Sequence, residues 1–267
     1  MYNYINNFLL TKFYDSLPRF FSRKIFKILK IFFVPTPLKK LPDDNHPSKY
    51  DKNIKNIIIK KSKENDFQPF ISYTKLLETL KKYQKNKSNI KFYDFGPCNI
   101  DLYLYLSKKL KNLNYIYFDQ PQFNRGVKEI KNDNNFFNLN IDLDFKSEKT
   151  DLDFLYFGSS IQYLKNYKEI LKKFLANKPK YIIISQTPFY SSKNKLDDIV
   201  LKQINLHPVI NFAYLINYDS FLTLMEKNGY VLKEKNLNRV IKFLNFKNFD
   251  KNYQFIDFFD LVFKCDV

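Results

Sequence analysis

Short apolar segments alternate with segments of helical periodicity through the middle of the chain. The apolar segments are rich in residues that favour β-strands, and they span 90–95, 114–119, 135–139, 152–157 and 180–185. Helical patterns cover 70–86, 100–111, 123–131 and 166–176. Because strands and helices alternate, the pattern predicts a doubly wound α/β domain with a mostly parallel sheet.

The end of the chain departs from this alternation. A helix at 218–229 is followed by two apolar segments, at 230–237 and 253–265. Two strands after one helix predict a terminal pair with one antiparallel member. The long connection at 189–217 is expected to be irregular and to cover the edge of the sheet at which the parallel strands end.

The first 86 residues predict a helical and linker extension, and residues 87–267 predict the main domain. Within the extension, residues 15–34 have apolar side chains at three- and four-residue steps with basic residues between them. This pattern predicts a helix that either packs its apolar side on the main domain or lies on an anionic membrane surface. Packing is favoured because the polar face is short. Four prolines in 34–53 predict a loop.

The charge balance first indicates an anionic partner, since 45 Lys and Arg face 27 Asp and Glu, for a net charge of +18. Arginine, whose planar fork suits phosphates and bases, occurs only at four positions. Lys, Asn, Ile, Phe and Tyr are all abundant, as A/T-rich codon usage would produce. The charge therefore indicates a solvated lysine-rich surface, and nucleic acid is an improbable partner.

Cys98 and Cys265 are the only cysteines, so a disulfide framework or a zinc site is not expected. No apolar run is long enough for a membrane span, and a signal peptide is not expected. The sequence predicts a cytoplasmic protein, peripheral at the inner membrane face if residues 15–34 lie on that membrane.

Ligands of open parallel sheets bind where the strands end at their carboxyl edge. Asp94 and Gly96 follow the first strand, Asp119 ends the second, and Asp142 follows the third. The chain has four glycines, and two of them, Gly96 and Gly158, fall at these strand ends. Glycine there is consistent with a sharp turn or a close approach to a ligand.

The first loop, "DFGPCN" at 94–99, is neither a G-x-G-x-x-G fingerprint nor a P-loop. Pro97 removes one backbone donor that a pyrophosphate would use. A cofactor without phosphates, such as S-adenosylmethionine (SAM), suits the loop better. Asn99 can adopt left-handed backbone angles and so replace a glycine in part.

Four short motifs occur in order along the chain: Asp94-Phe95-Gly96, then "FDQP" at 118–121, "IQYL" at 161–164 and "QTP" at 186–188. Together they resemble a family of SAM-dependent methyltransferases found in bacterial surface-polysaccharide gene sets. That family typically reads D-F-G-G-S-L-G, V-E-Q-P, L-Q-Y-L and R-T-P. The resemblance covers roughly 90–235 and implies a class I methyltransferase fold with SAM at the carboxyl edge of the sheet.

The resemblance also implies roles for individual residues. Asp94 would order the loop, Gly96 would let the backbone approach the amino-acid tail of SAM, and Asp119 would bind the ribose hydroxyls. The implied cofactor site consists of Asp94, Gly96, Asn99, Asp119, Gln120, Asp142, Gly158 and Ser159. The implied acceptor pocket consists of Gln162, Tyr163 and Gln186.

The chain departs from the family at Pro97, Cys98 and Ile100, where Gly, Ser and Gly are typical, and at Gln186, where Arg is typical. The leading hypothesis is methyl transfer from SAM to a hydroxyl of a saccharide or polysaccharide precursor. His207 could act as the general base, although a histidine before a proline is also an ordinary loop residue. The alternatives are a scaffold protein with a degraded cofactor loop and, less favoured, an RNA methyltransferase.

Overall fold

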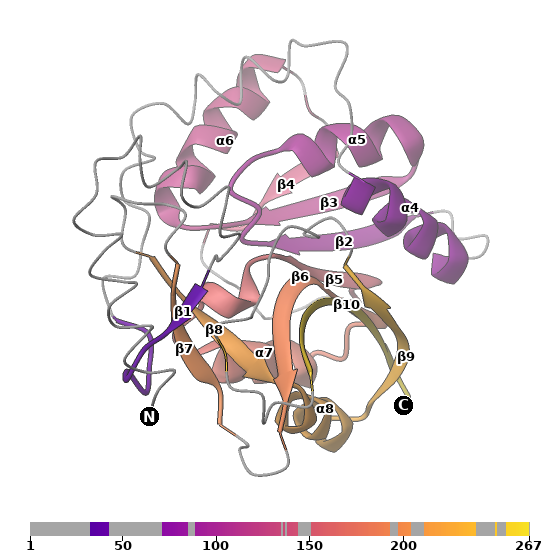
Figure 1. The fold of residues 1–267 in the computed structure, drawn as a ribbon. Helices are drawn as coiled ribbons and strands as arrows, with labels where there is room; N and C mark the ends of the chain where they lie inside the picture. Colours follow the sequence, from indigo (N-terminus) through magenta and orange to yellow (C-terminus); the bar gives the residue numbers. More distant parts are fainter. Residues whose placement is uncertain are drawn as a thin grey trace.

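The computed structural model describes residues 33–42, 71–84, 89–134, 136, 138–143, 151–192, 197–203, 211–238, 249 and 255–266. Within this part, a ten-stranded sheet forms the centre of the molecule. Helices α4, α5 and α6 cover one face of the sheet, and α7 and α8 cover the other (Figure 1). The doubly wound α/β architecture is therefore confirmed.

Five consecutive strands of the sheet are parallel. In spatial order they are β4 (Leu139–Ile141), β3 (Leu113–Phe118), β2 (Ile90–Phe95), β5 (Phe154–Gly158) and β6 (Tyr181–Ser191). Strand β10 (Phe255–Cys265) runs antiparallel between β6 and β9 (Tyr230–Leu237). This arrangement confirms the predicted terminal antiparallel strand. The strand predicted at 135–139 was placed too early, because β4 shares only Leu139 with it.

The helices keep close to the predicted segments. They are α4 (Ile71–Gln84), α5 (Asp101–Lys109), α6 (Pro121–Asn134), the short η2 (Ile161–Tyr163), α7 (Tyr167–Ala176) and α8 (Tyr218–Lys227). Pro121 occupies the first position of α6, where a helix needs no backbone N–H. At the start of α8, the Asn217 side chain accepts a hydrogen bond from the Ser220 backbone N–H at 2.8 Å.

The core lies on both faces of the sheet and is largely aromatic. Phe92 and Tyr115 belong to the cluster under α4, α5 and α6, and Phe157 and Phe189 belong to the cluster next to α7 and α8. Parallel strands buried on both faces read as continuous apolar runs. This is why the central strands could be located from the sequence.

The connection at 189–217 was expected to be irregular, and that expectation is wrong for its described part. Strand β6 continues to Ser191, β7 spans Ile199–Gln203, and β8 spans Asn211–Asn217. Strand β5 stops opposite Ser185, so the outer half of β6 has an open edge, and β8 pairs with it in parallel at Phe189 and Tyr190. An open strand edge needs hydrogen-bond partners, and β8 supplies them.

A short strand, β1 (Phe33–Pro35), pairs antiparallel with β7. The predicted helix at 15–34 is therefore wrong at its end, and its residues 15–32 lie outside the described part. Phe33 and Val34 are 3% and 1% exposed, so they are not available for membrane contact. Among the described residues, no helix has the length and apolar character to cross a membrane.

Candidate functional site

The loop after β2 turns sharply at Gly96, whose φ is +71°, and again at Cys98, whose φ is +57°. Asn99 was expected to take the left-handed conformation, but Cys98 takes it instead. Asn99 Oδ1 accepts a hydrogen bond from the backbone N–H of Asp101 at 2.9 Å. Asn99 therefore satisfies the backbone N–H of the first residue of α5, two positions along the chain, as an Asx turn does.

Gly96 is required by packing as well as by its backbone angle, since a Cβ there would lie 2.9 Å from Ser160 Cβ. We expect Gly96→Ala to destabilise the fold by about 2–4 kcal/mol through strain and overpacking. Adding Ser160→Gly should recover the packing part only. Urea unfolding of the single and double variants measures the contributions of strain and of overpacking. Equal stabilities of the two variants would exclude the contact as a cause.

Asp119, at the end of β3, is 7% exposed and holds the first loop. Its Oδ2 accepts the Cys98 backbone N–H at 2.6 Å and the Tyr117 hydroxyl at 3.4 Å, and its Oδ1 accepts the Gln120 backbone N–H at 2.7 Å. Burial raises the pKa of Asp119, and these donors oppose the shift. A carboxylate has about four lone-pair positions, so Oδ1 keeps room for one further donor. Asp119 thus orders the loop, a role that the sequence had assigned to Asp94.

Asn124, in the first turn of α6, links the residues that follow β3 to those that follow β4. The sequence analysis missed it. Asn124 Oδ1 accepts the Asp119 backbone N–H at 2.9 Å, and its Nδ2 donates to the Asp142 carbonyl at 3.0 Å. Asp142 Oδ2 also accepts the Tyr93 hydroxyl at 2.8 Å. A buried asparagine that bridges two loops has no local sequence signal beyond its place in a helix start.

Asp94 is 1% exposed and lies inside β2. The Tyr115 hydroxyl donates a hydrogen bond to Oδ2, whereas Oδ1 has no partner in the part of the chain that the structure describes. Burial raises the pKa of Asp94 to about 8; the Tyr115 hydrogen bond opposes the rise and the charge of Asp119 adds to it. At neutral pH, Asp94 is therefore largely protonated.

A pocket of about 270 Å³ opens beside Asp94, at the carboxyl edge of the sheet. Its lining residues are Ser72, Tyr73, Asp94, Pro97, Asn99, Leu102, Tyr156, Gly158 and Gln186. The structure thus brings together four predicted site residues: Asp94 and Asn99 from β2 and the loop after it, Gly158 from β5 and Gln186 from β6. Asp119, Gln120 and Asp142 belong to the neighbouring loops but not to the lining of this pocket. Ser72, Tyr73 and Tyr156 are lining residues that the sequence analysis missed. We call this hollow the edge pocket.

Gly158 makes room for an aromatic ring. A Cβ at Gly158 would lie 2.6 Å from Cε1 of Tyr156, whose side chain is 4% exposed. The ring of Tyr156 therefore lies along its own strand over Gly158, two residues further on, and forms a wall of the edge pocket. Gly158 thus makes room for this ring and also lines the edge pocket.

Ser159, Gln162 and Tyr163 lie outside the lining of the edge pocket. Gln162 is 1% exposed; it donates to Ser159 Oγ at 3.0 Å and accepts from Thr187 Oγ1 at 3.3 Å. The Tyr163 hydroxyl donates to Gln203 of β7 at 3.2 Å. These contacts fasten η2 to β6 and β7. His207 lies outside the described residues.

Gln186 enters the edge pocket through a β-bulge in β6. Its φ is +52°, and the pairing of β6 with β10 shifts register between Phe259 and Leu261. Asp260 Oδ1 accepts the Gln186 backbone N–H at 3.0 Å, the Ser185 hydroxyl at 2.6 Å and the Asn238 amide at 2.8 Å. Bulges redirect side chains near functional sites, and Asp260 holds this one.

The comparisons with known proteins bear on the fold. No protein-family model matches the chain, and no curated protein sequence is similar to it. The N-terminal domain of EvdMO1 with S-adenosylhomocysteine (SAH) bound superposes with a TM-score of 0.52 at 8% identity, over 84% of this chain and 100% of that one. Coclaurine N-methyltransferase, bound to N-methylheliamine and SAH, gives 0.52 at 10% identity, over 98% and 93%.

A third solved structure is 1,6-didemethyltoxoflavin-N1-methyltransferase of Burkholderia thailandensis, with a TM-score of 0.51 at 8% identity, over 88% of this chain and 95% of that one. At such low identities the likeness concerns the fold. The mostly parallel sheet found here, with β10 antiparallel between β6 and β9, agrees with this likeness in fold. The chain has a class I methyltransferase-like fold.

Proposed function

We propose that this protein is a SAM-dependent methyltransferase that binds the amino-acid end of SAM in the edge pocket. The observation that carries the proposal is the pair of buried oxygens there, Asp94 Oδ1 and Ser72 Oγ. Neither has a hydrogen-bond partner among the described residues. Buried polar atoms need partners, and an ammonium group is a donor that would satisfy both.

The surrounding residues fit the remainder of the cofactor. The free lone pair of Asp119 Oδ1 can accept one ribose hydroxyl, and Asp142 lies beyond the next strand, where adenine would be held. Bound SAM would supply a methyl group on a positively charged sulfur. The protein's part is then to exclude water and to align the acceptor, which can provide much of the acceleration.

The proposed acceptor is a hydroxyl of a saccharide or polysaccharide precursor. Two observations support this choice: the four motifs resemble methyltransferases of surface-polysaccharide gene sets, and the N-terminal domain of EvdMO1 was also crystallised in the presence of SAH and D-fucose.

Isothermal titration calorimetry tests the cofactor directly. We expect saturable binding of SAM and SAH with dissociation constants below about 1 mM. ATP and NAD should give no heat, because Pro97 removes a donor that their phosphates would use. A flat SAH titration at millimolar concentration would refute the proposal.

A scaffold protein that has lost cofactor binding is the second candidate, and two observations favour it. Asp119 already accepts three hydrogen bonds from its own chain, and the edge pocket of about 270 Å³ is small beside the ~300–1,000 Å³ usual for ligand pockets. This candidate predicts no SAH binding, so the same titration separates the two.

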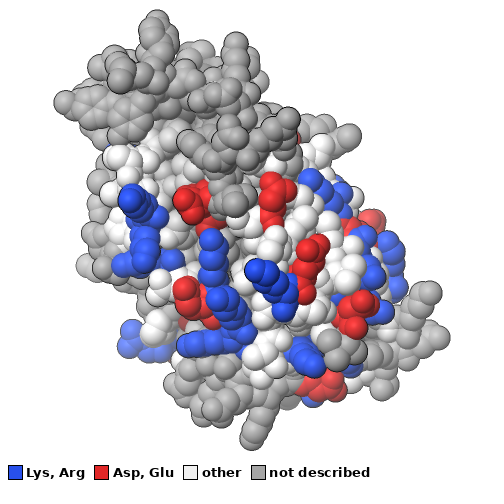
Figure 2. Space-filling model, turned by 90° about the horizontal axis from the view of Figure 1, so that it is seen from below, with Lys and Arg blue, Asp and Glu red and all other residues white. Residues whose placement is uncertain are grey.

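RNA methylation has less support. Figure 2 shows the molecule from below Figure 1, and basic and acidic side chains are interspersed over the described part of that face. A nucleic-acid interface would gather lysine and arginine into one patch and would bind with a steep salt dependence. A filter-binding series from low to high salt measures that dependence.

A further inference from the structure

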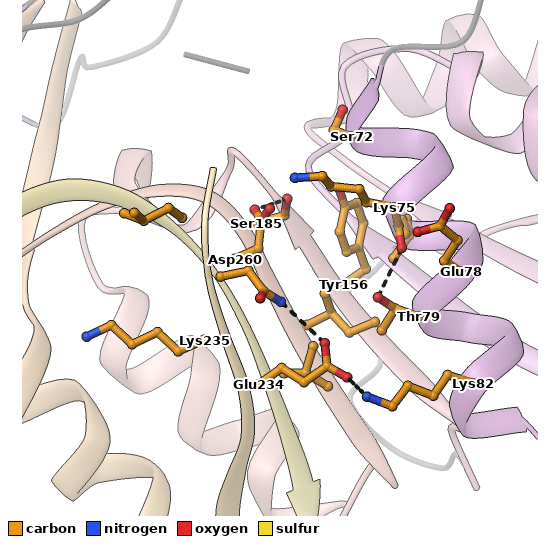
Figure 3. A pocket seen from close by; sticks show the side chains of 15 residues that line it. Ser72, Lys75, Glu78, Thr79, Lys82, Tyr156, Ser185, Glu234, Lys235 and Asp260 are labelled. Carbon is orange, nitrogen blue, oxygen red and sulfur yellow. Dashed lines mark hydrogen bonds and ion pairs between the residues drawn. The ribbon is translucent and has the colours of Figure 1, made fainter. Parts of the chain in front are cut away.

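A second and larger hollow lies between α4 and strands β6, β9 and β10 (Figure 3). Its volume is about 690 Å³, which is within the usual range for small-molecule sites. Lys82 and Glu234 form an ion pair of 2.5 Å in its wall, where the Tyr83 hydroxyl also donates to Glu234 at 2.6 Å. This ion pair joins the C-terminal part of α4 to β9. We call this hollow the α4 groove.

The α4 groove meets the edge pocket. Ser72, near the start of α4, and Tyr156, on β5, line both hollows. Tyr156 is 4% exposed and a Cβ on Gly158 would lie 2.6 Å from its ring, so the ring is held in place where the two hollows adjoin. A molecule in the groove would therefore approach the edge pocket beside Tyr156 and Ser72, which is the geometry that an acceptor next to a methyl donor requires.

The walls of the groove offer mixed hydrogen-bonding groups over an apolar floor. Ser185 and Asp260 lie together on the sheet side, at the bulge, and the Lys75 side chain extends toward them from α4 (Figure 3). Leu76, Ile183 and Val262 supply the apolar surface. Hydroxyl, carboxylate and ammonium groups set around an apolar floor suit a polyhydroxylated ring, which has both polar edges and apolar C–H faces.

The described lining of the groove has no excess of positive charge, although the whole chain carries +18. Lys75 and Lys82 share it with three acidic residues, at 78, 234 and 260, whereas the Lys235 side chain points away from the hollow (Figure 3). Lys82 is paired with Glu234, and the Lys235 ammonium lies 3.8 Å from the centroid of the Tyr218 ring and 4.6 Å from that of Phe259. A site for a phosphorylated or otherwise polyanionic acceptor would carry an excess of positive charge. This one does not.

We infer that the α4 groove is the acceptor site and that it takes a neutral, polyhydroxylated molecule of roughly disaccharide size. The inference rests on the proposed methyltransferase function, because it is contact with the edge pocket that makes the groove an acceptor site. Beyond that function, it says where the acceptor binds and that the acceptor carries no anionic group.

Saturation-transfer NMR on the full chain loaded with SAH tests the groove. The probes are sucrose, maltose and lactose, compared with glucose 1-phosphate and glucuronic acid. Thr79→Trp fills the groove from α4, and Asn236→Trp, at an exposed residue that pairs with Asp260 of β10, fills it from β9. Thr74→Trp is the matched control, since Thr74 is an exposed residue of the same helix outside the groove lining.

We expect saturation transfer to at least one neutral disaccharide in the wild type and in Thr74→Trp, and its loss in Thr79→Trp and Asn236→Trp. Calorimetric SAH binding should be the same in all four proteins. The inference is overturned if both groove variants keep the sugar signal, if the anionic sugars bind better, or if no sugar binds while SAH does. If SAH fails to bind but the groove variants still lose the sugar signal, the groove stands as a sugar site and the methyltransferase proposal falls.

Discussion

Asparagine in place of Asp94 is expected to make the protein more stable than the wild type above pH 8 and no more stable near pH 4. The pKa of Asp94 is 3.8 when unperturbed and about 8 in the fold, where burial raises it. Between these values the folded state holds a proton that the unfolded state has released. The stability of the wild type therefore falls as pH rises, by about 1.4 kcal/mol per pH unit, and the loss is complete above pH 8.

The asparagine side chain would carry no charge and could still accept the Tyr115 hydrogen bond, so Asp94→Asn should lack this pH-dependent loss. Over the whole interval the difference sums to roughly 4–6 kcal/mol. Urea unfolding of both proteins at steps from pH 4 to pH 9 measures it. Asp151→Asn is the control, because the Asp151 side chain is 75% exposed. Parallel stability curves for the wild type and Asp94→Asn would contradict the assignment of the shift to this carboxyl.

Asp94→Asn also has a consequence for the cofactor. A cationic ligand beside Asp94 favours the ionised carboxylate, so SAM should bind the wild type with release of a proton below pH 8. Calorimetry in buffers of different ionisation enthalpy detects that proton. The release should disappear in Asp94→Asn, where position 94 has no proton to lose.

The parts of the fold that could be predicted are those whose signal is local. The β2 strand was placed correctly at 90–95 because strands buried on both faces are continuously apolar. Strand β8 was missed because its partner is the outer half of β6, which is exposed as an edge only because β5 ends opposite Ser185, and β7 pairs in turn with β8. That difference in length is a property of the assembled sheet.

The candidate site shows the same division. Parallel topology places Asp94 and Gly158 at one edge of the sheet, so their proximity followed from their positions after strands. The hydrogen-bond partner of each carboxylate could not be predicted from the sequence. Asp119, for example, accepts the Cys98 backbone N–H across a turn that only the folded loop defines. Ser72 could not be found from the sequence, since it reaches the edge pocket from a helix outside the strand–loop pattern.

Alanine in place of Asp119 is expected to weaken SAH binding by about 100-fold or more. The change leaves the backbone N–H groups of Cys98 and Gln120 without their acceptor and removes the lone pair available to a ribose hydroxyl. Hydrogen bonds to a charged group contribute about 1.5–3 kcal/mol each, and about 1.4 kcal/mol corresponds to a tenfold change in affinity. The one bond to the ribose accounts for about 10- to 100-fold, and the loosened loop, which has to be ordered again on binding, supplies the rest.

Asp257→Ala is the matched control for Asp119→Ala. Asp257, on β10, is half-buried and accepts a hydrogen bond from its neighbour Phe258 at 2.7 Å. It lines neither the edge pocket nor the α4 groove, so its removal should leave SAH binding unchanged. Calorimetry of both variants, with circular dichroism to check folding, measures the difference. If Asp119→Ala binds SAH as tightly as Asp257→Ala does, then the Asp119 carboxylate serves only to hold its own loop, and the ribose must be bound elsewhere.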